Sequence, residues 1–443
     1  MENPPVLGFD LVSQAFKQDP LPTFARMRQA GPVIRARMAV FGSVWLATTH
    51  EAVTDLLSDH HRFVMSPSAA GNRWMGALLR WLPRTFRPAT TNMLLRDEPD
   101  HRRLRHLVDR AFRVRSIDAL RPRLEALADE AADGLAEQAS RTPDGVDLLA
   151  HFARPFPLAV ICELLGLPPE DRAKFTRWAA GFTTASSLPG IVRAFRGLGK
   201  TMSYLRDEIA RQTRHPRDGL LAALIEAEME GDRLTEDELL AMVFLLLVAG
   251  HETTLNQITG SVLVLIDHPE QRRELTADWR LADSAVPELF RYLSFAQISK
   301  PRFARQDVTF RDQSIRRGQM IFACLGSANS DPAVFGNPER LDLRRHPNPH
   351  VAFGDGIHFC LGAALARTEV EIALRCLFTR FPTLELAVPR SRVRFSRYPG
   401  THGLVSLPVR LVSSEAWLRP RARSYRCAAS QLATTASSSS PMA

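Results

Sequence analysis

Cysteine is scarce in this sequence, which has five among 443 residues, at positions 162, 324, 360, 376 and 427. No two of them are spaced as C-x-x-C, so neither a disulfide framework nor a zinc site is expected. Long apolar runs are missing too, because the longest, which contains Met242 to Ala249 and starts at Leu239, is far shorter than the roughly 20 residues of a membrane span. Met1–Pro5 lacks the basic and apolar regions of a signal peptide. These absences predict a cytoplasmic protein without a membrane span.

The sequence also lacks a glycine-rich flavin or nicotinamide fingerprint, an alternation of strands with helices, and an internal repeat. A fused reductase domain and an α/β fold are therefore not expected. Helical periodicity dominates, and strand-like segments are short: a hairpin of residues 33–37 and 44–47 around Gly42, and strands at 308–310 and 320–323. The predicted fold is mainly α with small β-sheets.

Charge is unbalanced, at +9, and the excess is mostly arginine spread along the chain without a lysine-rich block. No nucleic-acid-binding motif accompanies it, so an acidic protein partner is a better expectation than nucleic acid. With 45% hydrophobic and 24% charged residues, the chain can bury a large core. Periodicity vanishes at about residue 413, which predicts one domain over 1–412 and a disordered tail over 413–443.

Two helices are predicted with particular clarity. One runs from Asp100 to Phe112, with apolar residues at helical spacing and charged residues on its other faces. The other opens at Thr235 with Glu238 three residues later, a capping box, and runs to about Asp267. Because its middle is apolar nearly all round, this long helix must be buried and must organise a single core.

One cysteine lies in a distinctive setting, Phe353-Gly-Asp-Gly-Ile-His-Phe-Cys-Leu-Gly362, just before a helical stretch that starts at Ala363. The N–H groups and dipole at a helix start lower a thiol pKa, which a thiolate ligand requires. Gly356 and Gly362 would let the backbone approach a flat ligand closely. Taken alone, Cys360 is better explained as a small buried hydrophobe, the usual fate of a free cysteine.

A second pattern, Ala249-Gly-His-Glu-Thr-Thr254, lies midway along the long helix. Gly250 costs about 1 kcal/mol relative to alanine in a helix interior, and tight helix packing is one reason to keep it. Thr253 can return its hydroxyl to the Ala249 carbonyl and bend the helix. Glu252 lies within an apolar stretch and needs a partner or a function, whereas His251 is expected on the helix surface.

The cysteine segment resembles the ligand loop of the cytochrome P-450 family, Phe-x-x-Gly-x-x-x-Cys-x-Gly, and every fixed position is filled. The resemblance covers about residues 8–412 and implies the cytochrome P-450 fold and a soluble, monomeric haem-thiolate monooxygenase. Haem b would be bound with Cys360 as the axial ligand to the iron, where the thiolate favours O–O cleavage. Phe353 and Ala249 would contact the haem.

The same resemblance assigns roles elsewhere. Glu252 and Thr253 match the family's acid–alcohol pair, at which the helix deforms: Thr253 would hydrogen-bond dioxygen and Glu252 would relay protons. Glu288 and Arg291 match a structural Glu-x-x-Arg pair, and Arg340 would complete their buried network. The two haem propionates require cationic partners, which the resemblance places at His101, Arg105, Arg302 and His358.

Because no reductase domain is predicted, electrons must come from a separate ferredoxin or flavodoxin with its reductase. Such partners are usually acidic, and a basic face beside the haem would receive them at Arg102, Arg103, His106, Arg110 and Arg113. Apolar segments at 74–81, 182–195 and 295–298 fall where the family lines its substrate pocket, although ordinary packing explains them equally well. We expect a hydrophobic substrate of medium to large size, such as a fatty acid, terpenoid, steroid or polyketide.

Two other functions stay open from the sequence. A peroxide-driven haem-thiolate peroxygenase is disfavoured by the intact Glu252–Thr253 pair, which such enzymes tend to lack. A non-catalytic haem protein that binds a ligand or gas predicts no substrate turnover under any reducing system.

Overall fold

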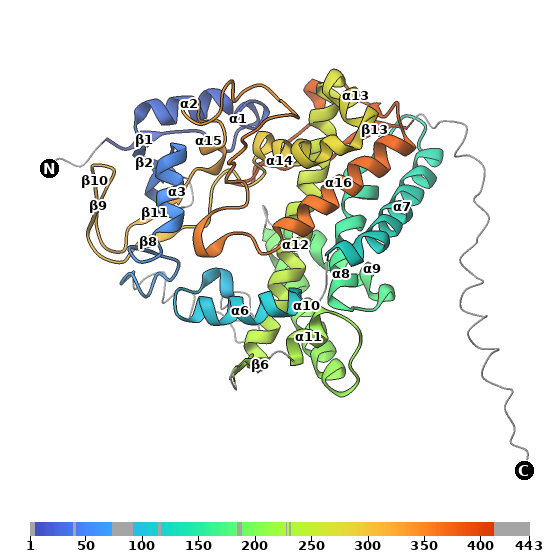
Figure 1. Ribbon diagram of the computed structural model, residues 1–443, viewed down its shortest axis with the longest axis horizontal. Coiled ribbons are helices and arrows are strands. Elements are labelled where there is room, and N and C mark those ends of the chain that lie inside the picture. Colours follow the sequence, from blue (N-terminus) through green and yellow to red (C-terminus); the bar gives the residue numbers. More distant parts are fainter. Residues whose placement is uncertain are drawn as a thin grey trace, which may run out of the picture.

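The computed structural model describes residues 5–38, 41–72, 92–113, 117–183, 188–226, 228–229 and 232–411. Helices fill one side of the molecule, while a sheet and the first helices of the chain lie on the other (Figure 1). The helices described are α1 (Gln14–Gln18), α2 (Leu21–Ala30), α3 (His50–Ser58), α6 (Asp100–Arg113), α7 (Ile117–Arg141), α8 (Pro155–Leu165), α9 (Arg172–Thr183), α10 (Leu188–Arg214), α11 (Leu220–Glu226), α12 (Glu236–Asp267), α13 (Pro269–Ala277), α14 (Ala282–Leu293), α15 (Leu325–Ala328) and α16 (Ala363–Arg380).

A six-stranded sheet has the order β1-β2-β3-β11-β8-β4. Its strands are β1 (Leu7–Gly8), β2 (Val33–Met38), β3 (Gly42–Ala47), β11 (Met320–Ala323), β8 (Arg302–Ala304) and β4 (Phe63–Val64). β2 and β3 form the predicted antiparallel hairpin, and β11 then joins β3 in parallel. Because β8 pairs with β11, the sheet fixes Arg302 at its place beside the helical part.

The remaining strands form small sheets, as expected for a mainly α fold. A three-stranded sheet has the order β12-β13-β5, and two pairs are β9 with β10 and β6 with β7. These strands are β12 (Glu385–Leu386), β13 (Pro408–Arg410), β5 (Val146–Asp147), β9 (Val308–Phe310), β10 (Gln313–Ile315), β6 (Glu228–Met229) and β7 (Asp232–Arg233).

The long helix α12 begins and ends as the sequence predicts. The Thr235 hydroxyl accepts a hydrogen bond from the Glu238 N–H at 3.3 Å, and the Glu238 carboxylate accepts one from the Thr235 N–H at 3.0 Å. Together they satisfy two N–H groups that the helix itself cannot. Its length and hydropathy would also suit a membrane span, but 61% of that apolar window is buried inside the protein, as in a core helix.

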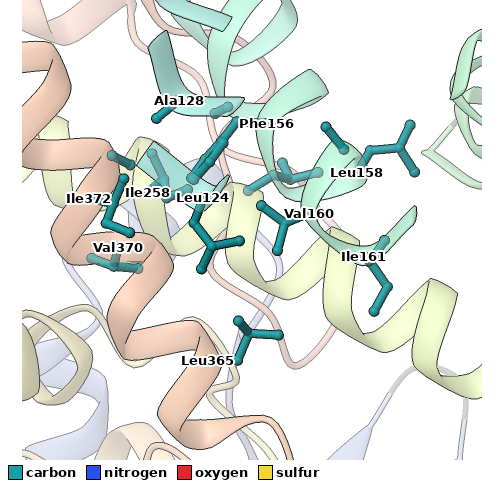
Figure 2. Close-up of a cluster of buried hydrophobic side chains, with 14 of the residues drawn as sticks. Leu124, Ala128, Phe156, Leu158, Val160, Ile161, Ile258, Leu365, Val370 and Ile372 are labelled. Atoms are coloured by element: carbon teal, nitrogen blue, oxygen red, sulfur yellow. The ribbon is translucent and has the colours of Figure 1, made fainter. Parts of the chain in front are cut away.

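The main core lies where α12 meets α7, α8 and α16. Figure 2 shows side chains from these four helices gathered together, among them Leu124, Phe156, Val160, Ile258 and Val370. Full burial of one such side chain stabilises the fold by about 1.5–3 kcal/mol. The cluster includes residues from Met93 to Val409, whereas the buried residues of the N-terminal segment form separate smaller clusters with the sheet. Since α16 crosses α12 (Figure 1), this core holds the two helices that border the candidate site.

Candidate active site

A cavity of about 390 Å³ lies between α12 and the segment that carries Cys360. Most of its lining is apolar. Helix α12 contributes Leu245, Ala249, Gly250 and Thr253, and the cysteine segment contributes Phe353, Gly354, Cys360 and Gly362. The two motifs singled out in the sequence therefore face one space, although about a hundred residues separate them.

Cys360 is the one exposed cysteine among those that the structure describes; Cys162 and Cys324 are buried and Cys376 is intermediate. Its exposure is toward the cavity, which it lines. The Cys360 N–H donates to the Phe353 carbonyl at 3.0 Å. The Phe353 ring packs against Phe290, with ring centroids 4.6 Å apart. The loop is thus held at both ends, and its thiol is presented to the cavity.

The sequence predicts a lowered pKa for the Cys360 thiol, but the structure gives a raised one. Burial raises the pKa of Cys360, and this effect outweighs the Gly362 N–H and the Arg105 charge, which both lower it. Arg105 is held nearby because its Nη1 donates to the Phe359 carbonyl at 2.8 Å. The helix start and a cation do act in the expected direction, but protein packed around the thiol removes the water that would stabilise its anion.

Gly356 and Gly362, the two glycines that the sequence singled out, lie in different surroundings. Gly356 has a φ of +68°, and a side chain there would collide with the backbone of Leu57 and Ser58 on α3. It therefore serves packing against α3, and the prediction that it faces a flat ligand is wrong. Gly362 lines the cavity, and no atom lies within 4 Å of where its Cβ would be. The open space at Gly362 is therefore consistent with the predicted close approach of a flat ligand.

The four predicted propionate partners come together at one edge of the cavity. His101 on α6, Arg105, Arg302 on β8 and His358 all line it, and the rings of His101 and His358 lie 4.2 Å apart. His101 and Arg302 are each 2% exposed. Burial lowers the pKa of Arg302 to about 10. Burial, and then the neighbouring His101, Arg302 and Arg105, lower the pKa of His358 to about 3.

Two polar atoms at this edge make no hydrogen bond within the described ranges, Nδ1 of His101 and Nη1 of Arg302. The former lies 3.7 Å from a Glu98 carboxylate oxygen. A buried donor without a partner costs about 1–3 kcal/mol, and more when charged. An anionic ligand at this edge would satisfy both atoms. A thiolate-ligated haem needs a cysteine, an apolar slot and hydrogen-bond donors, some of them charged, for its propionates. The residues around this cavity fit these three needs.

For the motif Ala249–Thr254 on α12, one predicted detail is confirmed and another is wrong. Thr253 Oγ1 donates to the Ala249 carbonyl at 2.6 Å, as predicted, and both residues line the cavity. However, α12 continues as an α-helix through the motif, so the expected deformation is absent from this described helix. A Cβ at Gly250 would lie 3.3 Å from Cδ1 of Ile161 on α8. Close packing against α8 thus explains the glycine.

Glu252 projects away from this lining. Asn256 Nδ2 donates to the Glu252 carbonyl at 2.8 Å. Burial raises the pKa of the Glu252 carboxyl, while Arg154 and Asn256 lower it. His251 is buried, not on the surface as predicted: its Nε2 donates to the Arg154 carbonyl at 3.1 Å, and burial lowers its pKa to about 4. The acid of the pair therefore faces the Arg154 region while the alcohol faces the cavity.

The predicted Glu-x-x-Arg pair is present and fully buried. Arg291 Nε and Nη2 donate to the two Glu288 carboxylate oxygens at 2.7 and 2.8 Å. The third side chain is Arg345, whose Nε lies 3.1 Å from both oxygens, and not Arg340, as predicted. Arg340 is exposed and contributes its carbonyl, which accepts from Arg291 and Arg345. Asn337, at a φ of +48°, belongs to the turn that carries Arg340 outward.

The predicted pocket segments are matched in part. Phe295 and Ala296 line the cavity. Gln297 instead accepts a hydrogen bond from Lys17, and Ile298 packs against the small core formed by α1, α2 and the sheet. Residues 74–81 and the side chains of 182–195 lie outside the described residues. Sequence reasoning missed several lining residues, which are Met93, Leu94, Ile161, Leu164, Leu246, Leu325 and Glu369. Glu369 carried a signal, because it lies at helical spacing between Leu365 and Ile372 on the apolar face of α16.

Comparison with known proteins agrees with this site. The cytochrome P-450 family model matches residues 198–394. The mycinamicin IV hydroxylase/epoxidase of Micromonospora griseorubida is 39% identical over 87% of this chain and 94% of its own length. The vitamin D(3) 25-hydroxylase of Pseudonocardia autotrophica is 39% identical over 90% of this chain and 96% of its own.

Solved structures give the same answer for the fold. The cytochrome P-450 PksS of Bacillus subtilis 168 superposes with a TM-score of 0.81 at 35% identity, and the match covers 92% of this chain and all of that one. The identity and coverage of these relatives exceed what a shared fold alone requires. This chain therefore belongs to the cytochrome P-450 family, the haem-thiolate monooxygenases that bind haem b through a cysteine thiolate.

Proposed function

We propose that this protein inserts one atom of dioxygen into a C–H or C=C bond of a hydrophobic substrate in the cavity between α12 and the Cys360 segment. The observation that carries this proposal is the meeting of an exposed thiol, the Thr253 hydroxyl and two buried nitrogen atoms that make no hydrogen bond at one apolar space. Residues 1–412 would form a single catalytic domain of a monomeric, cytoplasmic enzyme.

Each side of the cavity has a separate task in holding the cofactor. Haem b, when bound, supplies the oxidising chemistry that splits dioxygen. The Cys360 thiolate would hold its iron, with Phe353 and Ala249 as apolar contacts. The propionates would be received by the guanidinium groups of Arg105 and Arg302 and by the imidazole rings of His101 and His358, which all lie at the cavity edge.

Thr253 and Glu252 would manage protons from the two faces of α12. The Thr253 hydroxyl gives its hydrogen to Ala249, so its oxygen is free to accept a hydrogen bond from a water in the cavity. Oxygen insertion needs two protons for each dioxygen, because the second oxygen atom leaves as water. Burial raises the pKa of the Glu252 carboxyl, which lies near Arg154. This carboxyl would pass protons from that side of the helix toward Thr253.

Replacing Thr253 by alanine should lower the product formed per electron by at least about tenfold, since a lost proton-transfer group typically costs about a hundredfold or more in rate. Electrons would leave as peroxide instead, because no hydroxyl fixes the water that delivers the proton. Product, peroxide and electron consumption are measured together. Thr253→Ser should keep most of the coupling.

Thr259→Ala is the matched control for this variant. Thr259 lies on the same helix and donates to the Leu255 carbonyl four residues back, but it is fully buried and does not belong to the cavity lining. Equal coupling in Thr253→Ala and the wild type would refute the role of Thr253. Turnover with hydrogen peroxide alone, and none with a reductase system, would favour the peroxygenase.

The substrate class is proposed from the cavity lining and from the relatives. Apolar side chains from several elements, including Leu94, Phe112, Ile161, Leu164 and Phe295, line the cavity. Relatives named as a mycinamicin IV hydroxylase/epoxidase and a vitamin D(3) 25-hydroxylase support a bulky, largely hydrocarbon substrate. A polyketide, steroid, terpenoid or fatty acid meets this description, and a screen that follows the haem Soret band would rank them.

Electrons would arrive from an acidic ferredoxin or flavodoxin, together with its reductase, at the basic residues of α6. Arg102 is highly exposed and pairs with Glu98 at 2.8 Å, and Arg103 pairs with Glu238. His106 and Arg110 are exposed on the same helix, and the side chain of Arg113 lies outside the described ones. Arg105 ties α6 to the cysteine loop, so a partner docked on α6 lies beside the proposed haem site.

Arg102→Gln should slow association with an acidic ferredoxin several-fold at low ionic strength, because charged residues at the rim of an interface mainly set the association rate. The difference should shrink as salt is added. Stopped-flow reduction measures it. Arg141→Gln is the control. It also removes an exposed ion pair between residues four apart, here with Glu137, but Arg141 lies at the end of α7. Equal slowing in both variants, or no salt dependence, would contradict docking on α6.

A further inference from the structure

Lys17 on α1 is a buried ammonium group to which neither the motifs nor the proposed haem contacts give a role. Its side chain is fully buried. The Nζ atom donates to the Thr401 carbonyl at 2.5 Å, to the Gln297 amide oxygen at 3.3 Å and to the Tyr398 carbonyl at 3.4 Å. All three acceptors are uncharged, and an ammonium group has three N–H bonds to donate. The lysine therefore joins three points of the chain at once.

Stability alone does not explain a lysine at this position. Burial lowers the pKa of Lys17 to about 8, and this effect outweighs the attraction of Asp10. The folded protein thus disfavours the charged form of Lys17 when it is compared with water. An apolar side chain of similar length would avoid that cost. We therefore looked for a task that needs a group with three donors.

Two segments that are distant in the chain meet at this lysine. Residues 295–298 and 400–403 lie side by side, and Ala296 forms an antiparallel bridge with Thr401. Hydrogen bonds of 2.7, 2.9 and 3.2 Å between backbone atoms join the two segments. The lysine holds one residue of each, Gln297 through its amide oxygen and Thr401 through its carbonyl.

The segment 295–298 is part of the cavity wall. Phe295 and Ala296 line the cavity, whereas none of the described lining residues comes from α1. On its other side this segment packs close to α12: a side chain at Gly403 would collide with Asn256 and would lie 3.3 Å from a ring carbon of Phe295. The wall at Phe295 is therefore held between α12 and the bonds of the lysine.

We propose that Lys17 is a positioning residue that fixes the cavity wall at Phe295 and Ala296, and so decides how a bulky substrate fits into the cavity. It acts through Gln297 and Thr401, and it does not line the cavity itself. The proposal rests on the function proposed above, because it concerns the substrate of that same site. Without the three bonds, the wall segment would shift, and the space beside Phe295 would change in size.

Lys17→Met in the holoenzyme tests the proposal, because methionine has a similar length and no N–H bond to donate. Imidazole and clotrimazole are the probes. Both bind haem iron through an imidazole nitrogen, but only clotrimazole carries three aromatic rings that reach the cavity walls. We expect the dissociation constant of clotrimazole to change by at least about fivefold, which corresponds to about 1 kcal/mol. That of imidazole should stay within about twofold. The shift of the haem Soret band measures both.

Gln14→Met is the matched control, because Gln14 also ties α1 to the C-terminal part of the chain. Its Nε2 donates to the Phe395 carbonyl at 2.6 Å, and its Oε1 accepts from the Phe395 N–H at 3.2 Å. Phe395 does not belong to the described lining of this cavity. The control variant should lose stability as Lys17→Met does, but both dissociation constants should stay within about twofold of the wild type.

Amide hydrogen exchange supplies a readout that needs no ligand. The N–H groups of Gln297 and Ile298 donate to the Gly400 carbonyl. They should exchange at least about tenfold faster in Lys17→Met, because the segment opens more easily, and at the wild-type rate in Gln14→Met. If Lys17→Met does not fold, Gln297→Met removes one acceptor of the lysine and should give the same selective effect on clotrimazole.

Several results would overturn the proposal. Clotrimazole binding by Lys17→Met as in the wild type would do so. Equal changes for both probes, or equal changes in Gln14→Met, would show that Lys17 only stabilises the fold. Azole binding involves no oxygen chemistry, so it is independent of the proposed function. Wild-type coupling in Thr253→Ala would count against the role of Thr253 and leave this inference intact. Unchanged binding in Lys17→Met, with Thr253→Ala uncoupled, would do the reverse.

Discussion

Cys360→Ser is expected to abolish oxygen insertion, with turnover lowered by about a thousandfold or more. A serine hydroxyl stays protonated near neutral pH and cannot replace the electron-donating thiolate. A loss of about 4 kcal/mol in transition-state stabilisation already corresponds to a thousandfold. The variant should still fold, because Cys360 borders the cavity and its N–H bond to the Phe353 carbonyl uses backbone atoms alone. Incorporation of ¹⁸O from labelled dioxygen into product measures the effect.

Cys376→Ser is the control for this substitution. Cys376 lies on α16, is partly exposed, and has its Sγ 3.6 Å from an Asp129 carboxylate oxygen. Burial is the main cause that raises the pKa of its thiol to about 12, so it is an unreactive thiol. Its turnover should stay within about twofold of the wild type, as for a substitution away from the site. Labelled product from Cys360→Ser at the wild-type rate would remove Cys360 from the mechanism.

Glu288→Ala is expected to destabilise the protein by about 3–5 kcal/mol, the cost of breaking a buried ion pair by removing one partner. Glu288 is fully buried, and Arg291 is 1% exposed. Without the carboxylate, the Arg291 and Arg345 guanidinium groups would lose their counter-ion, and the Asp342 N–H would lose its acceptor. Denaturant unfolding measures the loss, and haem retention should fall with it because this network joins α14 to the segment before Cys360.

The two arginines provide an internal comparison for that network. Arg345→Ala should cost about 2 kcal/mol or more, since it removes a largely buried partner of Glu288. Arg340→Ala should cost less than about 0.5 kcal/mol, as an exposed side chain usually does. Equal losses from both substitutions would contradict the assignment of Arg345 as the third member.

Features fixed by local chemistry could be predicted from the sequence. The capping box at Thr235, the bond from Thr253 to Ala249 and the Glu288–Arg291 pair each join residues three or four positions apart in a helix. The helical repeat alone sets such distances. The hairpin of β2 and β3 followed from short alternating segments around Gly42 for the same reason.

Features that depend on packing between distant segments could not be predicted in this way. Arg340 and Arg345 are both arginines near one turn, and only the path of the backbone decides which one points inward. His251 could be placed inside only by knowing that α8 and Arg154 cover that face of α12. Gly356 looked like a ligand contact because its sequence does not reveal that α3 packs on it.

The cavity itself shows the same limit. Its lining comes from α6, α8, α12, α14, α16, β8 and the cysteine segment, and no periodicity links these positions. The basic residues at its edge could be predicted only through resemblance to a family, since His101, Arg302 and His358 share no spacing in the chain. The pKa of Cys360 depends on the balance between burial and nearby positive groups, and that balance needs coordinates.

The assignment of Cys360 as the axial ligand is tested most directly by the absorption spectrum of the reduced protein with carbon monoxide. The wild type and Cys376→Ser should show the long-wavelength Soret band of thiolate-ligated haem, and Cys360→Ser, loaded with haem, should lack it. The same long-wavelength band in Cys360→Ser, or its absence from the haem-loaded wild type, would contradict Cys360 as the haem ligand.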